Sequence, residues 1–148
     1  FAYFITEGQG VDNAFNLYRA NYRPNDRNPK PRATVCVWAL AADTEDEAWR
    51  LFQSRARWKM DRNTGRIGAL LPPEQAVRDY NASEQVALAE LRAGALVGSA
   101  PQVADKLRKL AERLQLDEVV IITWTHEPAA QARSYELLAK EFSLTTST

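Results

Sequence analysis

The sequence is poor in the residues from which most specialised sites are built. Its 148 residues include one cysteine, one histidine and six glycines. A single cysteine excludes an internal disulfide, and there is no His/Cys cluster with metal-ligand spacing. Neither a P-loop nor the glycine fingerprint of a dinucleotide site occurs. We therefore expect no metal site, and no apolar run is long enough to span a membrane.

An excess of either charge is also lacking. Lys plus Arg number 19, and so do Asp plus Glu. No basic block alternates with aromatic residues, so nucleic acid is not an expected partner. The chain opens on the strand-like run Phe1–Ile5 without the charged region of a signal peptide. We therefore expect a cytoplasmic protein and, because the chain opens within a strand, a fragment of a longer one.

The last third of the chain has the clearest pattern. Ser99 is followed three residues later by Gln102, which is a capping-box spacing, so a helix is predicted from about Ala100. The apolar run 119–122 suits a parallel strand that is buried on both faces. A second helix is predicted after Glu127 and Pro128. Its expected inward face consists of Ala132, Tyr135, Leu138 or Ala139, and Phe142.

Earlier segments repeat this alternation of strand and helix. A strand at 33–42 is followed by a helix capped by Thr44 and Glu47, and a helix at 83–92 is followed by a strand at 95–97. The pattern weakens over 60–81, which we interpret as a mobile loop or an insertion. Consecutive strand–helix units predict an α/β fold with about four parallel strands and flanking helices. At this length, we expect residues 1–148 to form a single domain.

Three segments resemble the luciferase-like flavin-dependent monooxygenases, the bacterial luciferase family of (β/α)8 TIM barrels. They are Ala41–Thr44 with Glu47 and Ala48; Val97–Ser99 followed by Gln102, Val103, Lys106 and Leu107; and Asp117–Ile121 through His126 to Arg133–Ala139. The resemblance covers nearly the whole chain. It implies the C-terminal half of the barrel, with the first four of its eight strands absent.

In such barrels the chemistry lies at the carboxyl ends of the strands. These ends are expected at Thr6 and Glu7, Ala42 and Asp43, Gly98 and Ser99, and Trp124–His126. The resemblance therefore makes Gly98, Ser99, Trp124 and His126 candidate cofactor-binding residues. It assigns no catalytic residue.

Each candidate also has an ordinary structural interpretation. His126 could hydrogen-bond flavin or substrate, or simply begin a helix. Ser99 could hold an anion, or only cap its helix. Trp38 and Trp124 could line a pocket, although aromatic residues in strands are more often core. Cys36 is interpreted as a small buried hydrophobe. Arg133 and Glu136 are interpreted as a surface ion pair.

The resemblance implies that the parent protein is an oxidoreductase in which reduced FMN and O2 oxygenate a small organic substrate. Two alternatives stay open. One is hydride transfer by the deazaflavin F420 on the same fold. The other is a non-catalytic half-barrel that pairs as a homodimer, because its open sheet edges and apolar inner face would associate. As a separate chain, the half-barrel is expected to be inactive.

Overall fold

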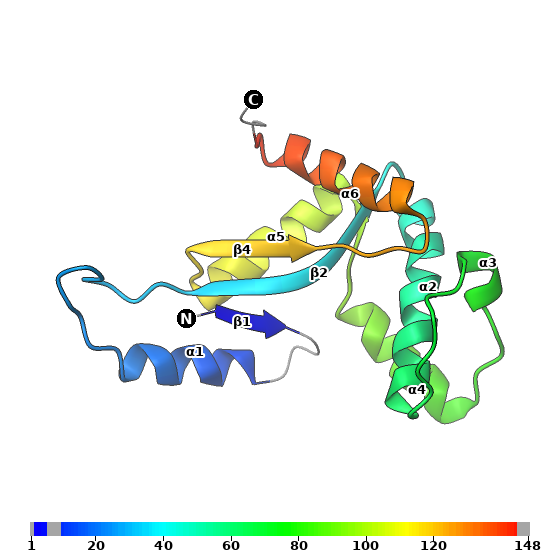
Figure 1. Ribbon diagram of the computed structural model, residues 1–148, viewed down its shortest axis with the longest axis horizontal. Coiled ribbons are helices and arrows are strands. Elements are labelled where there is room, and N and C mark those ends of the chain that lie inside the picture. Colours follow the sequence, from blue (N-terminus) through cyan, green and yellow to red (C-terminus); the bar gives the residue numbers. More distant parts are fainter. Residues whose placement is uncertain (1, 6–9, 145–148) are drawn as a thin grey trace. The chain divides into compact units, whose positions relative to one another are not determined.

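Strands and helices alternate along the chain, as the sequence predicts (Figure 1). The computed structural model describes residues 2–5 and 10–144. In chain order the elements are β1 (Ala2–Ile5), α1 (Val11–Ala20), β2 (Thr34–Ala42), α2 (Glu45–Asn63), α3 (Pro73–Ala76), α4 (Ala82–Ala93), β3 (Leu96–Ser99), α5 (Ala100–Leu114), β4 (Glu118–Ile122) and α6 (Pro128–Glu141). They form two compact units.

The first unit, Phe1–Trp38 and Asp105–Ile122, is built on parallel pairing around the start of β2. Strands β1 and β4 both pair with this part of β2, in parallel. Phe15 of α1 and Leu107 of α5 are buried in its core. The guanidinium of Arg19 also donates to the carbonyl oxygen of Gln115 over 2.9 Å, which links the end of α1 to the end of α5.

One face of this sheet is less covered than the other. Val35 and Val37 are buried, whereas Cys36 between them is half-buried. Val120, its partner in register on β4, is 43% exposed. The prediction that the strand around Val120 is buried on both faces is therefore wrong. A run of β-branched residues indicates a strand but does not reveal whether both of its faces have a covering layer.

The second unit, Ala39–Ala104 and Thr123–Thr148, contains the rest of β2, the whole of β3 and the residues that follow β4. Residues Ala39–Ala42 pair in parallel with Leu96–Ser99 of β3. These four residues of β2 are all buried, so the prediction of two covered faces is correct there. Helix α2 buries Ala48, Leu51 and Phe52 toward this core, as expected.

Two helices of this unit differ from the predicted faces. In α6 the buried residues are Ser134 and Leu138, while Tyr135 is 40% exposed. The polar Ser134 is tolerated because its hydroxyl accepts a hydrogen bond from the Ala41 N–H over 2.9 Å. Helix α4 buries none of its residues, and Val86 is 61% exposed. A periodic apolar pattern was therefore sufficient to predict both helices but not their packing.

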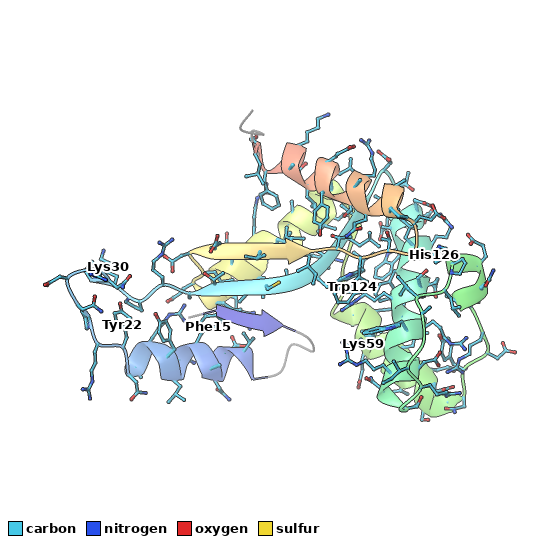
Figure 2. All side chains as sticks on the ribbon, viewed as in Figure 1. Phe15, Tyr22, Lys30, Lys59, Trp124 and His126 are labelled. Atoms are coloured by element: carbon cyan, nitrogen blue, oxygen red, sulfur yellow. The ribbon has the colours of Figure 1, made fainter. Side chains whose placement is uncertain are left out.

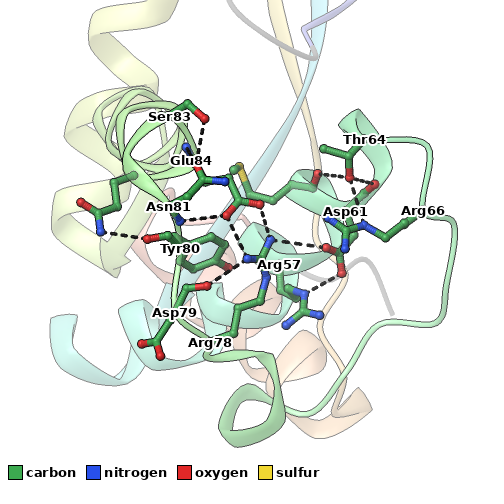
Figure 3. Close-up of polar contacts among 12 residues, drawn as sticks. Arg57, Asp61, Thr64, Arg66, Arg78, Asp79, Tyr80, Asn81, Ser83 and Glu84 are labelled. Carbon is green, nitrogen blue, oxygen red and sulfur yellow. Dashed lines mark hydrogen bonds and ion pairs between the residues drawn. The ribbon is translucent and has the colours of Figure 1, made fainter.

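The segment 60–81 contains more order than its sequence suggests. Helix α2 continues to Asn63, and the short α3 interrupts the connection. Figure 3 shows Arg78 joined to Glu84 by hydrogen bonds of 2.7 and 3.0 Å, with Asp61 3.8 Å away. The mobility of this segment, and the prediction of one domain over the whole chain, stay predictions. Thr6 and Glu7 lie outside the described residues.

Candidate functional site

The candidate residues lie in the second unit: Gly98 and Ser99 end β3, and Trp124 and His126 come after the end of β4. At the end of β4, the buried Thr123 fixes the point at which the chain leaves the strand. Its hydroxyl donates to the Ala39 carbonyl oxygen over 2.6 Å, and its N–H donates to the Tyr135 hydroxyl over 2.8 Å. Its carbonyl oxygen accepts from the side chain of Gln131 over 2.5 Å. Trp124 and His126 follow directly, so their backbone starts from a fixed position.

The end of β3 is tied to the start of α2. The Gln102 side-chain oxygen accepts from the Ser99 N–H over 2.8 Å and from its hydroxyl over 3.0 Å. The Gln102 amide group then donates to a carboxylate oxygen of Glu45 over 2.7 Å. The capping-box spacing thus predicted a real contact. In this arrangement both donors of Ser99 are directed to Gln102, and the bond from the Ser99 N–H is the backbone half of a capping box.

Gly98 has a backbone conformation that favours glycine, with φ of 152°. A Cβ atom added to it would lie 2.7 Å from the Gln102 side-chain oxygen and 3.1 Å from the Gln102 Cβ. The absence of a side chain is therefore needed for the close approach of Gln102. This local requirement explains Gly98 without a ligand.

The end of β2 carries a surface ion pair that the sequence did not reveal. The guanidinium of Arg133 donates to both carboxylate oxygens of Asp43, over 2.6 and 3.1 Å, and also to Glu136 over 3.2 Å. The predicted contact of Arg133 with Glu136 is therefore present. The hydrogen bond from Arg133 lowers the pKa of Asp43, so the carboxylate stays ionised at neutral pH.

Trp124 is held by side chains of α2 that sequence reasoning did not identify as part of the site. The Arg55 guanidinium lies 4.8 Å from the centre of the Trp124 ring, and the Trp58 ring lies edge-to-face at 6.2 Å. Burial lowers the pKa of Arg55 to about 10, which leaves the side chain protonated at neutral pH. The spacing of Arg55 and Trp58, three residues apart on one helix, was the available signal.

His126 lies in the exposed connection between β4 and α6, two residues beyond Trp124 (Figure 2). Its neighbour Thr125 is anchored, because its hydroxyl donates to the Glu127 carbonyl oxygen over 2.6 Å. The imidazole is therefore accessible to a ligand at this edge of the unit. Trp124 contacts the middle of α2, and Ser99 is linked to the start of the same helix through Gln102.

The remaining candidates behave as structural residues. Trp38 is 7% exposed, which agrees with a place in the core. Burial raises the pKa of the Cys36 thiol, so the thiolate needed for nucleophilic chemistry is disfavoured.

Two negative findings accompany these. Within residues 2–5 and 10–144, no three His, Cys, Asp or Glu side chains are grouped as metal ligands. A search of the described helices found none that is long and apolar enough to cross a membrane.

Comparison with known proteins reveals a consistent set of relatives. The chain is 31% identical over 84% of its length to a luciferase-like monooxygenase of Escherichia coli strain K12. It is 32% identical over 97% of its length to the uncharacterized protein YwcH of Bacillus subtilis. It spans only 37% and 43% of these two relatives. No family model matches the chain.

A solved structure agrees with these relatives. The crystal structure of apo-MsnO8 superimposes on 91% of the chain, with a TM-score of 0.75 and 26% sequence identity. The chain covers 42% of that structure. Together with the alternation of parallel strands and helices, this match confirms the predicted α/β class, part of a (β/α)8 barrel.

Proposed function

We propose that this chain, which is related to the luciferase-like monooxygenases, contributes Gly98, Ser99, Trp124 and His126 to one side of a flavin site. The observation that carries the proposal is the position of Trp124. It follows the carboxyl end of β4, where barrel enzymes bind their ligands, and its ring contacts Arg55 and Trp58.

The chemistry of these residues fits a flavin. Trp124 offers part of an indole surface to an aromatic ring, and the protonated Arg55 beside it favours an anion. The exposed imidazole of His126 carries one nitrogen that can donate a hydrogen bond and one that can accept. Ser99 would have to release its hydroxyl from Gln102 before it could bind a phosphate group.

In the parent protein the reaction is proposed to be the oxygenation of a small organic substrate. Reduced FMN would supply the electrons and O2 the oxygen atom. The residues of this chain would bind and orient the ring and limit the access of water to it. F420, which transfers hydride, is the alternative cofactor for the same surface.

The half-barrel without catalysis is a second candidate, and one observation favours it. Val120 is 43% exposed on a sheet face where its neighbour Cys36 is only half-buried. An apolar sheet face of this kind is typical of a surface that a further layer of protein covers. A second copy of the chain would provide such a layer.

Titrations of FMN and of F420, followed by quenching of their fluorescence, test the flavin proposal. We expect saturable binding of FMN that weakens in Trp124→Leu and in His126→Ala. Trp49→Leu is the matched control, because Trp49 has a similar environment, with the Arg92 guanidinium 4.9 Å from its ring. Unchanged affinity in both site variants would remove these residues from the site. Tighter binding of F420 than of FMN would favour the deazaflavin alternative.

A further inference from the structure

A hollow lies beside Trp58, at the end of α2 that leads into the loop after Asn63. Its walls are formed by side chains and backbone of Trp58, Asp61, Arg66, Ile67, Gly68 and Ala69. Its volume is about 110 Å³. This is below the usual range of small-molecule sites, so the hollow holds one aromatic ring, and a second ring of a ligand would lie at its open rim.

The apolar part of the hollow is unusually accessible. Ile67 is 88% exposed at its rim, although a large aliphatic side chain gains stability from being covered. Nothing lies within 4 Å of a Cβ atom built on Gly68, so space remains above the backbone there. A flat ligand placed between Trp58 and this backbone would cover Ile67 as well.

The charge around the hollow favours an anion. The stretch 55–66 carries five basic residues and one acidic residue in a protein whose formal net charge is zero. The acidic residue, Asp61, forms an ion pair with Arg57, whose guanidinium donates to the Asp61 carboxylate over 2.6 Å (Figure 3). The Arg62 guanidinium, which is not part of the lining, lies 5.2 Å from the Trp58 ring centre. Arg66 itself lines the hollow.

Hydrogen bonds fix the loop that forms one wall of the hollow. The Arg66 N–H donates to the Asp61 carbonyl oxygen over 2.8 Å, and its guanidinium donates to the Thr64 hydroxyl over 3.2 Å. Asp61 in turn lies 3.8 Å from Arg78, which is joined to Glu84 (Figure 3). These contacts connect the loop to α4 and give the hollow a defined shape.

We propose that this hollow binds an aromatic carboxylate of one or two rings, with the ring between Trp58 and Gly68 and the carboxylate toward Arg62 and Arg66. An aromatic ring covers Trp58 and Ile67 together, and the carboxylate pairs with the excess positive charge. The hollow shares Trp58 with the surroundings of Trp124, but none of its other lining residues is part of the proposed flavin site, and the inference does not depend on flavin binding.

Titration of the chain with naphthoate tests the inference. The four tryptophans give separate indole N–H signals in a proton–nitrogen correlation spectrum. We expect the Trp58 signal, assigned by its loss in Trp58→Leu, to shift saturably. Neutral naphthamide should bind at least about threefold more weakly, and Arg66→Gln should remove much of this difference. Equal affinity for naphthoate and naphthamide would contradict the inference that the ligand of the hollow is an anion.

A second variant tests the inference even if Trp58→Leu does not fold. Gly68→Val fills the open space above the exposed loop and should weaken naphthoate binding about tenfold or more. Arg92→Gln is the matched control, because it removes a cation over the Trp49 ring and should leave binding unchanged. Undiminished binding in Gly68→Val would overturn the inference.

A competition with FMN separates this inference from the flavin proposal. Binding of naphthoate without binding of FMN would support the inference that the hollow binds aromatic carboxylates, and it would count against the proposed flavin site. Displacement of naphthoate by FMN would show that the hollow belongs to the flavin site, and the inference of a separate site would be wrong.

Discussion

The hydroxyl of Thr123 donates to the carbonyl oxygen of Ala39 over 2.6 Å, and Thr123 is only 2% exposed. This bond joins the residue that follows β4 to the buried part of β2, and both residues belong to the second unit. It sets the point from which Trp124 and His126 extend. The proposed site therefore depends on a buried hydroxyl that binds no ligand itself.

Replacement of Thr123 by valine should destabilise the chain. Valine has a similar shape but removes the donor to the Ala39 carbonyl oxygen, and the loss of a buried hydrogen bond costs about 1–3 kcal/mol. Urea unfolding followed by circular dichroism measures the change. Thr123→Ser, which keeps the hydroxyl, is the control and should lose less. Equal stability of the valine variant and the wild type would contradict this role.

Replacement of Gly98 by alanine should also reduce stability, by about 1–3 kcal/mol, because φ of 152° is strained for a residue with a side chain. The new Cβ would also displace the Gln102 side chain, 2.7 Å away, from Ser99. The same substitution in a Gln102→Ala background should cost less, because the contact at 2.7 Å with the Gln102 side-chain oxygen is absent and only the one with Cβ stays. If Gly98→Ala lowers the stability equally in the two backgrounds, the close contact with Gln102 does not contribute to the cost of the substitution.

The contact between Arg78 and Glu84 should make the order of segment 60–81 depend on pH. Hydrogen bonds from the Arg78 side chain and then from the Asn81 N–H lower the pKa of Glu84 to about 2, from an ordinary value of 4.5. The stabilisation is therefore fully present above about pH 4.5 and is lost as the pH falls through about 2.

Hydrogen exchange over residues 60–81 measures this effect. Glu84→Gln keeps an acceptor for the Asn81 N–H but removes the charge, so at neutral pH it should exchange faster than the wild type. The difference should shrink as the pH approaches 2, since the wild-type carboxyl group is then increasingly protonated. Other acidic residues titrate in both proteins and cancel in the comparison. A difference that does not change with pH would show that the charge of Glu84 is unimportant.

The exposed sheet face around Val120 should promote self-association. Val120→Lys places a charge on this face, where its register partner Cys36 is half-buried, and should shift the chain toward the monomer. Sedimentation velocity over a range of concentrations measures the change. Lys30→Ala, at an exposed position of the same unit, is the control and should behave as the wild type. A wild-type monomer at all concentrations would contradict pairing through this face.

The sequence was a good guide to the order of the elements. Capping pairs such as Ser99 with Gln102 lie three residues apart, so their contacts form within one helical turn and can be recognised locally. The apolar period likewise predicted α5 and α6. Burial depends on which elements meet in space, and that is why Val120 and Tyr135 were assigned to the interior incorrectly.

The candidate site was only partly predictable for the same reason. The barrel rule placed Trp124 and His126 after β4, and the structure places them there. The contact of Trp124 with Arg55 and Trp58 joins residues that are more than sixty positions apart. The ion pair of Asp43 with Arg133 is similarly distant in sequence. The spacing of Arg55 and Trp58 indicates that they share a face of α2, but neither contact can be inferred from nearby residues, and a basic residue in a helix usually indicates an exposed face.

The most direct test of the central claim is a fluorescence titration of FMN with the purified chain near neutral pH. Circular dichroism must first show that the chain is folded. The account predicts saturable quenching at micromolar protein concentration, because the side chains around Trp124 provide a usable part of the flavin site. A folded chain that causes no quenching would contradict the claim that these residues bind flavin.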